Sequence, residues 1–215
     1  MKRADTDILP KLWSPSLEAL ALLAVTLPLA LYAREPALWF LVPFAVITMQ
    51  RRTYADYGLD FSARTMWGTP RFHLLTCAII FVPYAMGHIL LARVWFGQHF
   101  TFALPERLPM LLWDQLLGVA LPEEFFFRGY LQSQLNASFG RPYRTFGAAW
   151  GLGLVFGAAL FALCHVPLGG PGQLIVFFPG LLYGWLRERT DNVLVPTVYH
   201  AVSNVLLKTM LLSLH

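Results

Sequence analysis

The 215-residue chain has little charge. Asp, Glu, Lys and Arg make up 13% of it, whereas soluble domains average about 25%. Hydrophobic residues make up 57%, mean hydropathy is +0.55, and apolar runs recur through nearly the whole length. This pattern is typical of a polytopic helical membrane protein. The net charge of +4 is weak, so we interpret it as the Lys/Arg bias of membrane topology and expect no nucleic-acid partner.

Other features are scarce or missing. The two cysteines, Cys77 and Cys164, lie inside apolar runs and lack CxxC spacing, which excludes a disulfide framework. No internal repeat, low-complexity segment or soluble domain is visible. The basic N-terminus lacks a small-residue cleavage site after its first apolar run, so we expect a retained helix there and not a removed signal peptide. We therefore expect residues 1–215 to form a single multi-pass integral membrane domain.

The apolar runs predict an all-α bundle of about seven to eight transmembrane helices. We place seven of them, at about 17–33, 36–50, 72–96, 109–136, 145–165, 173–187 and 193–213. The aromatic and arginine-rich stretch 53–71 is expected at the membrane interface. The most informative residues in such a bundle are polar ones inside the spans, which are costly and often functional.

The first polar cluster lies in "LPEEFFFRGYL" at 121–131. Glu124 and Arg128 are four residues apart, so they share a helix face in the favourable order for an ion pair. Glu123 is rotated about 100° from Glu124, which leaves it free to act as a general base. The alternative is a buried ion pair that only holds helices together.

Two further clusters lie on later spans. Phe161 and His165, in "FALCHVP", are one helical turn apart, although a single histidine near a helix end is often only interfacial. His200 and Asn204, in "YHAVSN", share a face of the last span. Two donors in a dry cavity suit an oxyanion, but membrane bundles also use such pairs for interhelical hydrogen bonds.

Counting along the expected spans places His165 and His200 near opposite membrane faces. To share a site, they need an irregular segment between them. We therefore expect "VPLGGPG" at 166–172 to be unwound inside the protein, where irregular backbone is tolerated if it lines a wet cavity.

The three clusters together provide carboxylates, an arginine, histidines and an asparagine on three spans, a set that fits amide hydrolysis by activated water. "EEFFFR", "FALCH" and "HAVSN" also match, in order, the motifs EExxxR, FxxxH and HxxxN. The chain thus resembles the CAAX-protease and bacteriocin-processing (CPBP, or Abi) family of intramembrane glutamic endopeptidases. The resemblance covers about residues 109–210, which we expect to be the catalytic core.

The resemblance implies roles for the first two motifs. Glu123 is expected to activate water with the help of His165. Glu124 and Arg128 are expected to support the site and to position substrate.

The resemblance further implies that His200 and Asn204 form the oxyanion hole. The sequence lacks HExxH, and the first motif provides carboxylates, so we predict no metal and no cofactor. The family fold has about eight transmembrane helices.

We therefore predict a peptide-bond hydrolase of a bacterial or archaeal inner membrane. It would cleave near the C-terminus of a membrane-associated or lipidated protein or peptide. Prenylated CAAX tails, bacteriocin leader peptides and C-terminal sorting anchors all stay open as substrates. The alternatives are a non-catalytic membrane immunity or scaffold protein, and a metalloprotease with Glu123, His165 and His200 as ligands.

Overall fold

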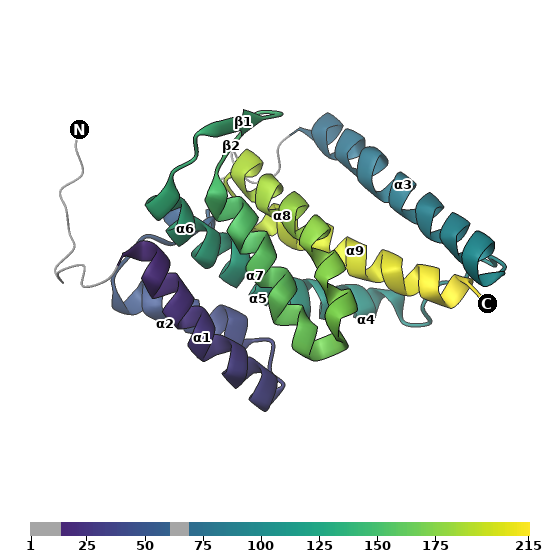
Figure 1. Ribbon diagram of the computed structural model, residues 1–215, viewed down its shortest axis with the longest axis horizontal. Helices are drawn as coiled ribbons and strands as arrows, with labels where there is room; N and C mark the ends of the chain where they lie inside the picture. Colours follow the sequence, from purple (N-terminus) through teal and green to yellow (C-terminus); the bar gives the residue numbers. More distant parts are fainter. Residues whose placement is uncertain (1–13, 61–68) are drawn as a thin grey trace.

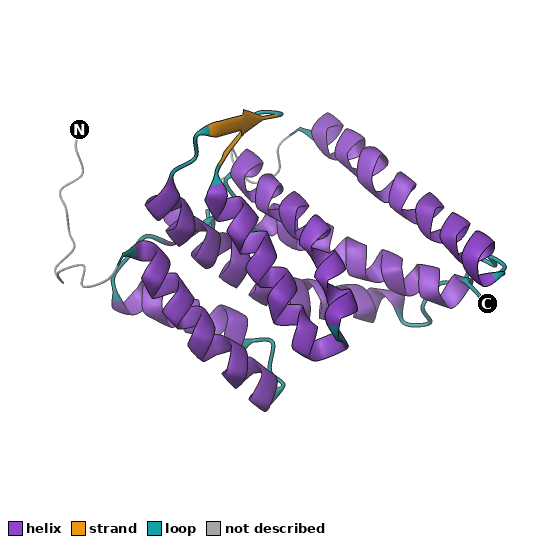
Figure 2. Ribbon diagram, viewed as in Figure 1, coloured by secondary structure: helices purple, strands orange, loops and turns teal. Residues whose placement is uncertain are grey.

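The structure is a computed structural model that describes residues 14–60 and 69–215. Helices make up most of the described residues, and one short hairpin is the single β-sheet among them (Figure 2). The predicted all-α architecture is therefore confirmed.

The first two helices form an antiparallel pair beside the rest of the bundle (Figure 1). Helix α1 spans Pro15–Ala33 and begins at Ser14, whose hydroxyl accepts the backbone N–H of Leu17. It ends at Arg34, and helix α2 follows at Leu38–Met49. Both helices agree with the predicted spans to within two residues.

Helix α3, Pro70–Phe96, lies along one side of the bundle next to α9 (Figure 1). Only 6% of its most apolar 18-residue window is buried. An apolar helix with so little protein around it matches a lipid environment. A short 3-10 helix, η1 at Tyr54–Tyr57, begins the stretch predicted to be interfacial, whose residues 61–68 lie outside the described part of the chain.

One continuous helical path from 108 to 139 carries the first motif, as predicted for 109–136. It contains two π-helical stretches, which flank the short segment that holds both glutamates. Its parts are α4 Leu108–Trp113, η2 Asp114–Ala120 (π), α5 Leu121–Glu124, η3 Phe125–Leu131 (π) and α6 Gln132–Phe139. Pro122 is the second residue after the first π stretch. Widened π turns of this kind are frequent at functional sites.

The prediction of a helix from 145 was wrong at its start. Strands β1, Tyr143–Thr145, and β2, Ala148–Trp150, pair there as an antiparallel hairpin. Its two turn residues, Phe146 and Gly147, both have positive φ (48° and 82°), as a tight type I′ turn requires.

Helix α7 then spans Leu152–Gly169. It runs through Pro167, so the expected unwinding of 166–172 inside the protein is also wrong. The break comes at Gly170, whose φ of 78° favours glycine, and the 3-10 helix η4 follows at Pro171–Val176. The last two helices are α8, Phe177–Thr190, and α9, Leu194–Ser213.

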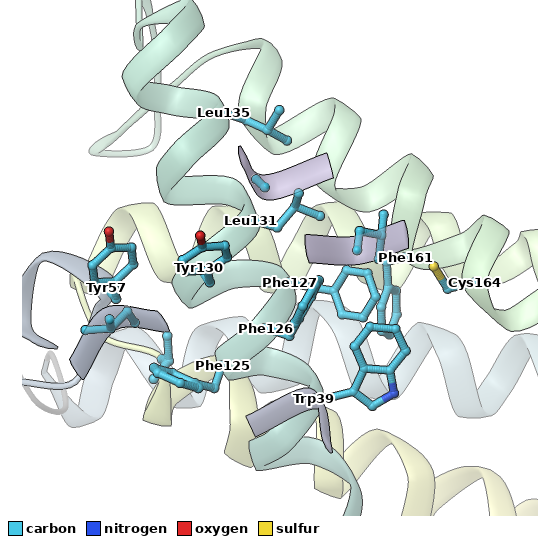
Figure 3. Packing of buried hydrophobic residues seen from close by; sticks show 14 of the residues in the cluster. Trp39, Tyr57, Phe125, Phe126, Phe127, Tyr130, Leu131, Leu135, Phe161 and Cys164 are labelled. Carbon is cyan, nitrogen blue, oxygen red and sulfur yellow. The ribbon is translucent and has the colours of Figure 1, made fainter. Parts of the chain in front are cut away.

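An aromatic core surrounds the first motif (Figure 3). Trp39 of α2 packs edge-on against Phe126, with ring centroids 4.8 Å apart, and also contacts Phe127. Phe127 in turn packs against Phe161 of α7, at 5.0 Å. The phenylalanines of "EEFFFR" therefore fix the glutamate-bearing helix between the α1–α2 pair and α7.

Three helices in the described residues are long and apolar enough to cross a membrane, namely α1, α3 and α7. Helix α2 is apolar but shorter. The count of seven to eight spans stays a prediction. Helix α9 is long enough at 20 residues, but it carries polar residues such as His200, Asn204 and Lys208, which lower its hydropathy.

Candidate active site

Glu124 is fully buried and has two partners. Its Oε1 accepts a hydrogen bond from Arg128 Nη1 at 3.1 Å, which is the ion pair expected from their spacing. The same oxygen lies 2.8 Å from Nδ1 of His200 on α9. A carboxylate paired with arginine can only accept, so His200 must donate through Nδ1. Glu124 thus links its own helix to α9.

Arg128 is buried between aromatic rings. Its guanidinium carbon lies 4.1 Å from the ring centroid of Phe161 and 5.4 Å from that of Tyr183, in cation–π geometry. Its Nη2 donates to the carbonyl of Gly180 at 3.3 Å. Gly180 permits this approach, since a Cβ there would lie 3.4 Å from Arg128 Nη2 and 3.3 Å from the Cβ of Ala158.

Glu123 faces two imidazoles without bonding to either. Its Oε2 lies 3.9 Å from Nε2 of His165 and 3.9 Å from Nε2 of His200, both beyond hydrogen-bond distance. Within the described residues this buried oxygen has no hydrogen-bond partner. The carboxylate and the two ring nitrogens therefore converge on one small space.

His165 is oriented by its own helix. Its Nδ1 lies 2.8 Å from the carbonyl of Phe161, and the two rings pack edge-on with centroids 4.4 Å apart. A carbonyl only accepts, so Nδ1 carries the proton and a neutral His165 presents a lone pair on Nε2 to Glu123. Phe161 therefore holds the His165 ring through both its carbonyl and its own ring.

The predicted conflict in depth between the two histidines does not arise. Helix α7 continues one turn past His165 to Gly169, so His165 lies inside the helix and not at its end. His200 lies in the second turn of α9. Both side chains reach Glu123 from regular helices, and no unwound segment is needed.

Asn204 lies apart from the carboxylate contacts. Its Nδ2 donates to Oε1 of Gln115, on η2, at 2.8 Å. The structure therefore brings five of the six predicted site residues into one contact network. The sixth, Asn204, is one turn from His200 on α9 and is held by Gln115.

Sequence reasoning missed two residues of α8 that shape the site. Tyr183 stacks on His200 with ring centroids 5.0 Å apart and planes 17° apart, and Gly180 accepts from Arg128. The repeat of Gly180, Tyr183 and Gly184 along one helix face was the available signal, because small residues four apart allow close packing.

A cavity of about 590 Å³ opens beside Glu123 and His165. Its volume lies within the range of small-molecule sites, about 300–1,000 Å³. Apolar side chains form most of its wall, together with Glu123, His165 and Arg34. The other lining residues are Leu27, Ala30, Leu31, Pro36, Trp39, Phe127, Cys164, Pro167 and Leu168.

In the metalloprotease alternative, Glu123, His165 and His200 of this site would be the metal ligands. The described residues contain no group of three His, Cys, Asp or Glu side chains arranged to hold one. The atoms that bind a tetrahedral zinc lie about 2.0–2.1 Å from the ion and therefore about 3.4 Å from one another. Oε2 of Glu123 lies 3.9 Å from Nε2 of either histidine, which is a longer distance. Glu123 therefore lies slightly farther from the two imidazoles than zinc ligands lie from one another, and the absence of a metal stays a prediction.

The fold and the site define an all-α membrane-type protein with a buried carboxylate–histidine centre. Residues 105–206, just under half of the chain, match the family model of type II CAAX prenyl endopeptidase Rce1-like proteins. This match confirms the resemblance to the CPBP family. The family indicates a protease, and together with the apolar helices it indicates an integral membrane protein. No curated protein matches the chain. No solved structure matches it either.

Proposed function

We propose that the protein is an intramembrane endopeptidase in which Glu123 activates a water molecule. The observation that carries this proposal is the buried Oε2 of Glu123. It has no hydrogen-bond donor among the described residues and lies 3.9 Å from Nε2 of both His165 and His200. A free carboxylate in a site of this kind is a good candidate for a general base.

A water molecule fits between Glu123 and His165. Both present acceptor atoms, and an oxygen about 2.8 Å from each can bridge atoms 3.9 Å apart. The water would donate one hydrogen to Glu123 and the other to Nε2 of His165. Its oxygen lone pair is then free to attack a peptide carbonyl, while Glu123 takes the proton.

His200 is suited to the opposite role, that of a donor. Ionised Glu123 and Glu124 together with Arg128 leave one net negative charge in a buried space, which is unfavourable. A protonated His200 would balance this charge. It would keep its Nδ1–H on Glu124 and point its Nε2–H toward the reacting carbonyl. Such a donor stabilises the oxyanion that forms when water attacks.

Asn204 would provide the second donor of the oxyanion hole. Gln115 accepts one of its two amide hydrogens, at 2.8 Å. The other hydrogen is left for substrate, and the contact with Gln115 holds the amide plane in place.

The substrate we propose is a membrane-associated or lipidated protein or peptide, cleaved near its C-terminus. The largely apolar cavity beside Glu123 supports an apolar ligand. Prenylated CAAX tails, bacteriocin leaders and C-terminal sorting anchors all meet this description. A single domain over 1–215 with its catalytic core at 109–210, a bacterial or archaeal inner membrane, and the absence of a nucleic-acid partner stay predictions.

Replacing Glu123 by Gln tests the proposal in cells. The C-termini of membrane proteins are compared by mass spectrometry between cells with wild-type protein and cells with Glu123→Gln. We expect truncated C-termini that disappear in the variant although the protein is still present in the membrane. Identical C-termini in both strains would instead favour the immunity or scaffold alternative.

The metalloprotease alternative has its own test. The 3.9 Å separations of Glu123 from the two histidines are slightly longer than those between zinc ligands, which favours a metal-free site. Purified protein should therefore keep its activity in the presence of a chelator. Loss of activity with chelator and its return with added zinc would support metal catalysis.

A further inference from the structure

Among the described residues that line the cavity beside the site, Arg34 is the single Lys or Arg. Arg34 lies where α1 ends, and Glu123 and His165 line the same cavity. Aliphatic and aromatic side chains such as Leu27, Leu31 and Phe127 form much of the remaining wall. The cavity thus combines an apolar wall, the proposed catalytic pair and one positive charge.

Two further observations concern the backbone and the charge of Arg34. It adopts the left-handed conformation, with φ 56° and ψ 34°, at a helix end where glycine is the usual residue. A side chain in this conformation costs free energy, and such positions are often functional. In addition, no acidic side chain within the described residues forms an ion pair with Arg34. Its guanidinium is available to an anion from outside the chain.

The chemistry of the cavity specifies such a ligand. A short apolar segment would bury its side chains against the wall, and an anionic group at its end would meet Arg34. A peptide provides this anion as its terminal carboxylate, which a guanidinium binds through two parallel hydrogen bonds.

We propose that Arg34 binds the C-terminal carboxylate of the substrate. This inference rests on the function proposed above. Arg34 would place the end of the chain, and the tail would lie along the apolar wall. The scissile bond would then reach Glu123. A carboxylate subsite makes the cleavage depend on the distance between the bond and the C-terminus.

The test compares two peptides that differ only at the end. Each has a prenylated cysteine followed by three apolar residues, and one ends in a free acid while the other ends in an amide. We expect the wild-type protein, in phosphatidylcholine vesicles, to show a kcat/KM about 10- to 100-fold higher for the free acid, the range of a charge-assisted hydrogen bond.

Variants assign this preference to one residue. Arg34→Gln should bring the ratio of the two kcat/KM values close to one, mainly by raising KM for the free acid, and Arg34→Lys should keep part of the preference. Arg51→Gln is the matched control, because Arg51 is also an exposed arginine with positive φ but does not line the cavity. It should keep the wild-type ratio.

Three results would overturn the inference. Equal cleavage of both peptides by the wild-type protein would remove the carboxylate preference and leave the proposed hydrolysis intact. An effect of Arg34→Gln that is equal for both peptides and appears only with anionic phosphatidylglycerol would assign Arg34 to lipid headgroups. No cleavage of either peptide by the wild-type protein would overturn the inference together with prenylated tails as substrates. The comparison of cellular C-termini described above then decides separately whether the protein is a protease.

Discussion

Glu188 and Glu123 are both largely buried, with side chains that are 2% and 13% exposed, but their surroundings differ. Glu188 of α8 accepts hydrogen bonds from Gln132 and Asn136, both at 2.6 Å, and from Arg141 at 3.0 Å. Every oxygen of Glu188 therefore has a donor. Glu123 has a buried oxygen that faces two ring nitrogens and, among the described residues, has no hydrogen-bond partner.

The contrast between Glu188 and Glu123 separates a carboxylate that holds helices together from one that is available for chemistry. A buried polar group usually finds its partners, and an exception needs an explanation. Glu188 ties α6 and the segment around Arg141 to α8, so its removal should cost stability. Glu123 lacks such partners, so its removal should cost activity.

The largest expected effect is on catalysis. Glu123→Gln keeps the shape of the side chain but removes the base, so kcat should fall by about 10²- to 10⁴-fold. The unfolding temperature should stay near that of wild type. The matched control is Glu188→Gln, which should be less stable and still cleave. Peptide cleavage and thermal unfolding in the same detergent compare the two, and similar activity losses in both variants would contradict the distinction.

The next largest effect concerns His200. His200→Ala removes the proposed oxyanion donor, so kcat should fall by about 10²- to 10³-fold while KM changes little. Steady-state kinetics on a lipidated peptide measure both constants. A higher KM with an unchanged kcat would show that His200 binds substrate instead.

The third effect is on stability. Glu188→Ala leaves Asn136 Nδ2 without its acceptor and removes one acceptor from Gln132 and one from Arg141, so the free energy of unfolding should fall by about 2–3 kcal/mol. Reversible unfolding in mixed micelles measures it. A loss below about 1 kcal/mol would mean that solvent or the exposed Arg141 compensates.

A smaller loss of stability is expected where Gly184 of α8 lies against the side chain of Gln132 of α6. A Cβ at Gly184 would lie 2.8 Å from Oε1 of Gln132, the glutamine that binds Glu188. Gly184→Ala should therefore cost about 1–3 kcal/mol through overpacking. Gly118→Ala is the control, because a Cβ there would meet nothing within 4 Å. Equal unfolding free energies for the two variants would contradict the close contact.

The smallest effect is on the stability at high pH, and it comes from the hydroxyl group of Tyr57, which lies outside the predicted spans. Burial raises the pKa of Tyr57, although a hydrogen bond from Arg52 opposes this. Because the pKa of Tyr57 is higher in the folded protein than the value of 10.0 in the unfolded chain, the neutral hydroxyl contributes its full stabilisation below pH 10.0. This stabilisation is lost as the pH rises above that value. Tyr57→Phe should therefore weaken the decline of stability above that pH. An unchanged decline would assign it to other groups.

Local sequence patterns predicted most helices of the fold and one ion pair of the site. Apolar runs located most helices to within a few residues, and the four-residue spacing predicted the pair of Glu124 and Arg128. The hairpin at 143–150 was missed because the Gly- and Ala-rich run that follows extends the apolar pattern, although Phe146-Gly147 forms a tight turn.

The contacts that complete the site could not be predicted from spacing. Glu124 and His200 are 76 residues apart, and Gln115 and Asn204 are 89 apart, so tertiary packing brings each pair together. The two π-helical stretches also change which side chains share a helix face. A sequence pattern read at 3.6 residues per turn cannot predict this change.

The central claim is that Glu123 activates water and does not attack the peptide itself. The most direct measurement is a single turnover in H₂¹⁸O with enzyme in excess over a cleavable peptide. The account predicts one ¹⁸O atom in the new carboxylate of the product and none in Glu123. A first-turnover product without ¹⁸O, with the label found in the Glu123 carboxylate, would show direct attack and contradict it.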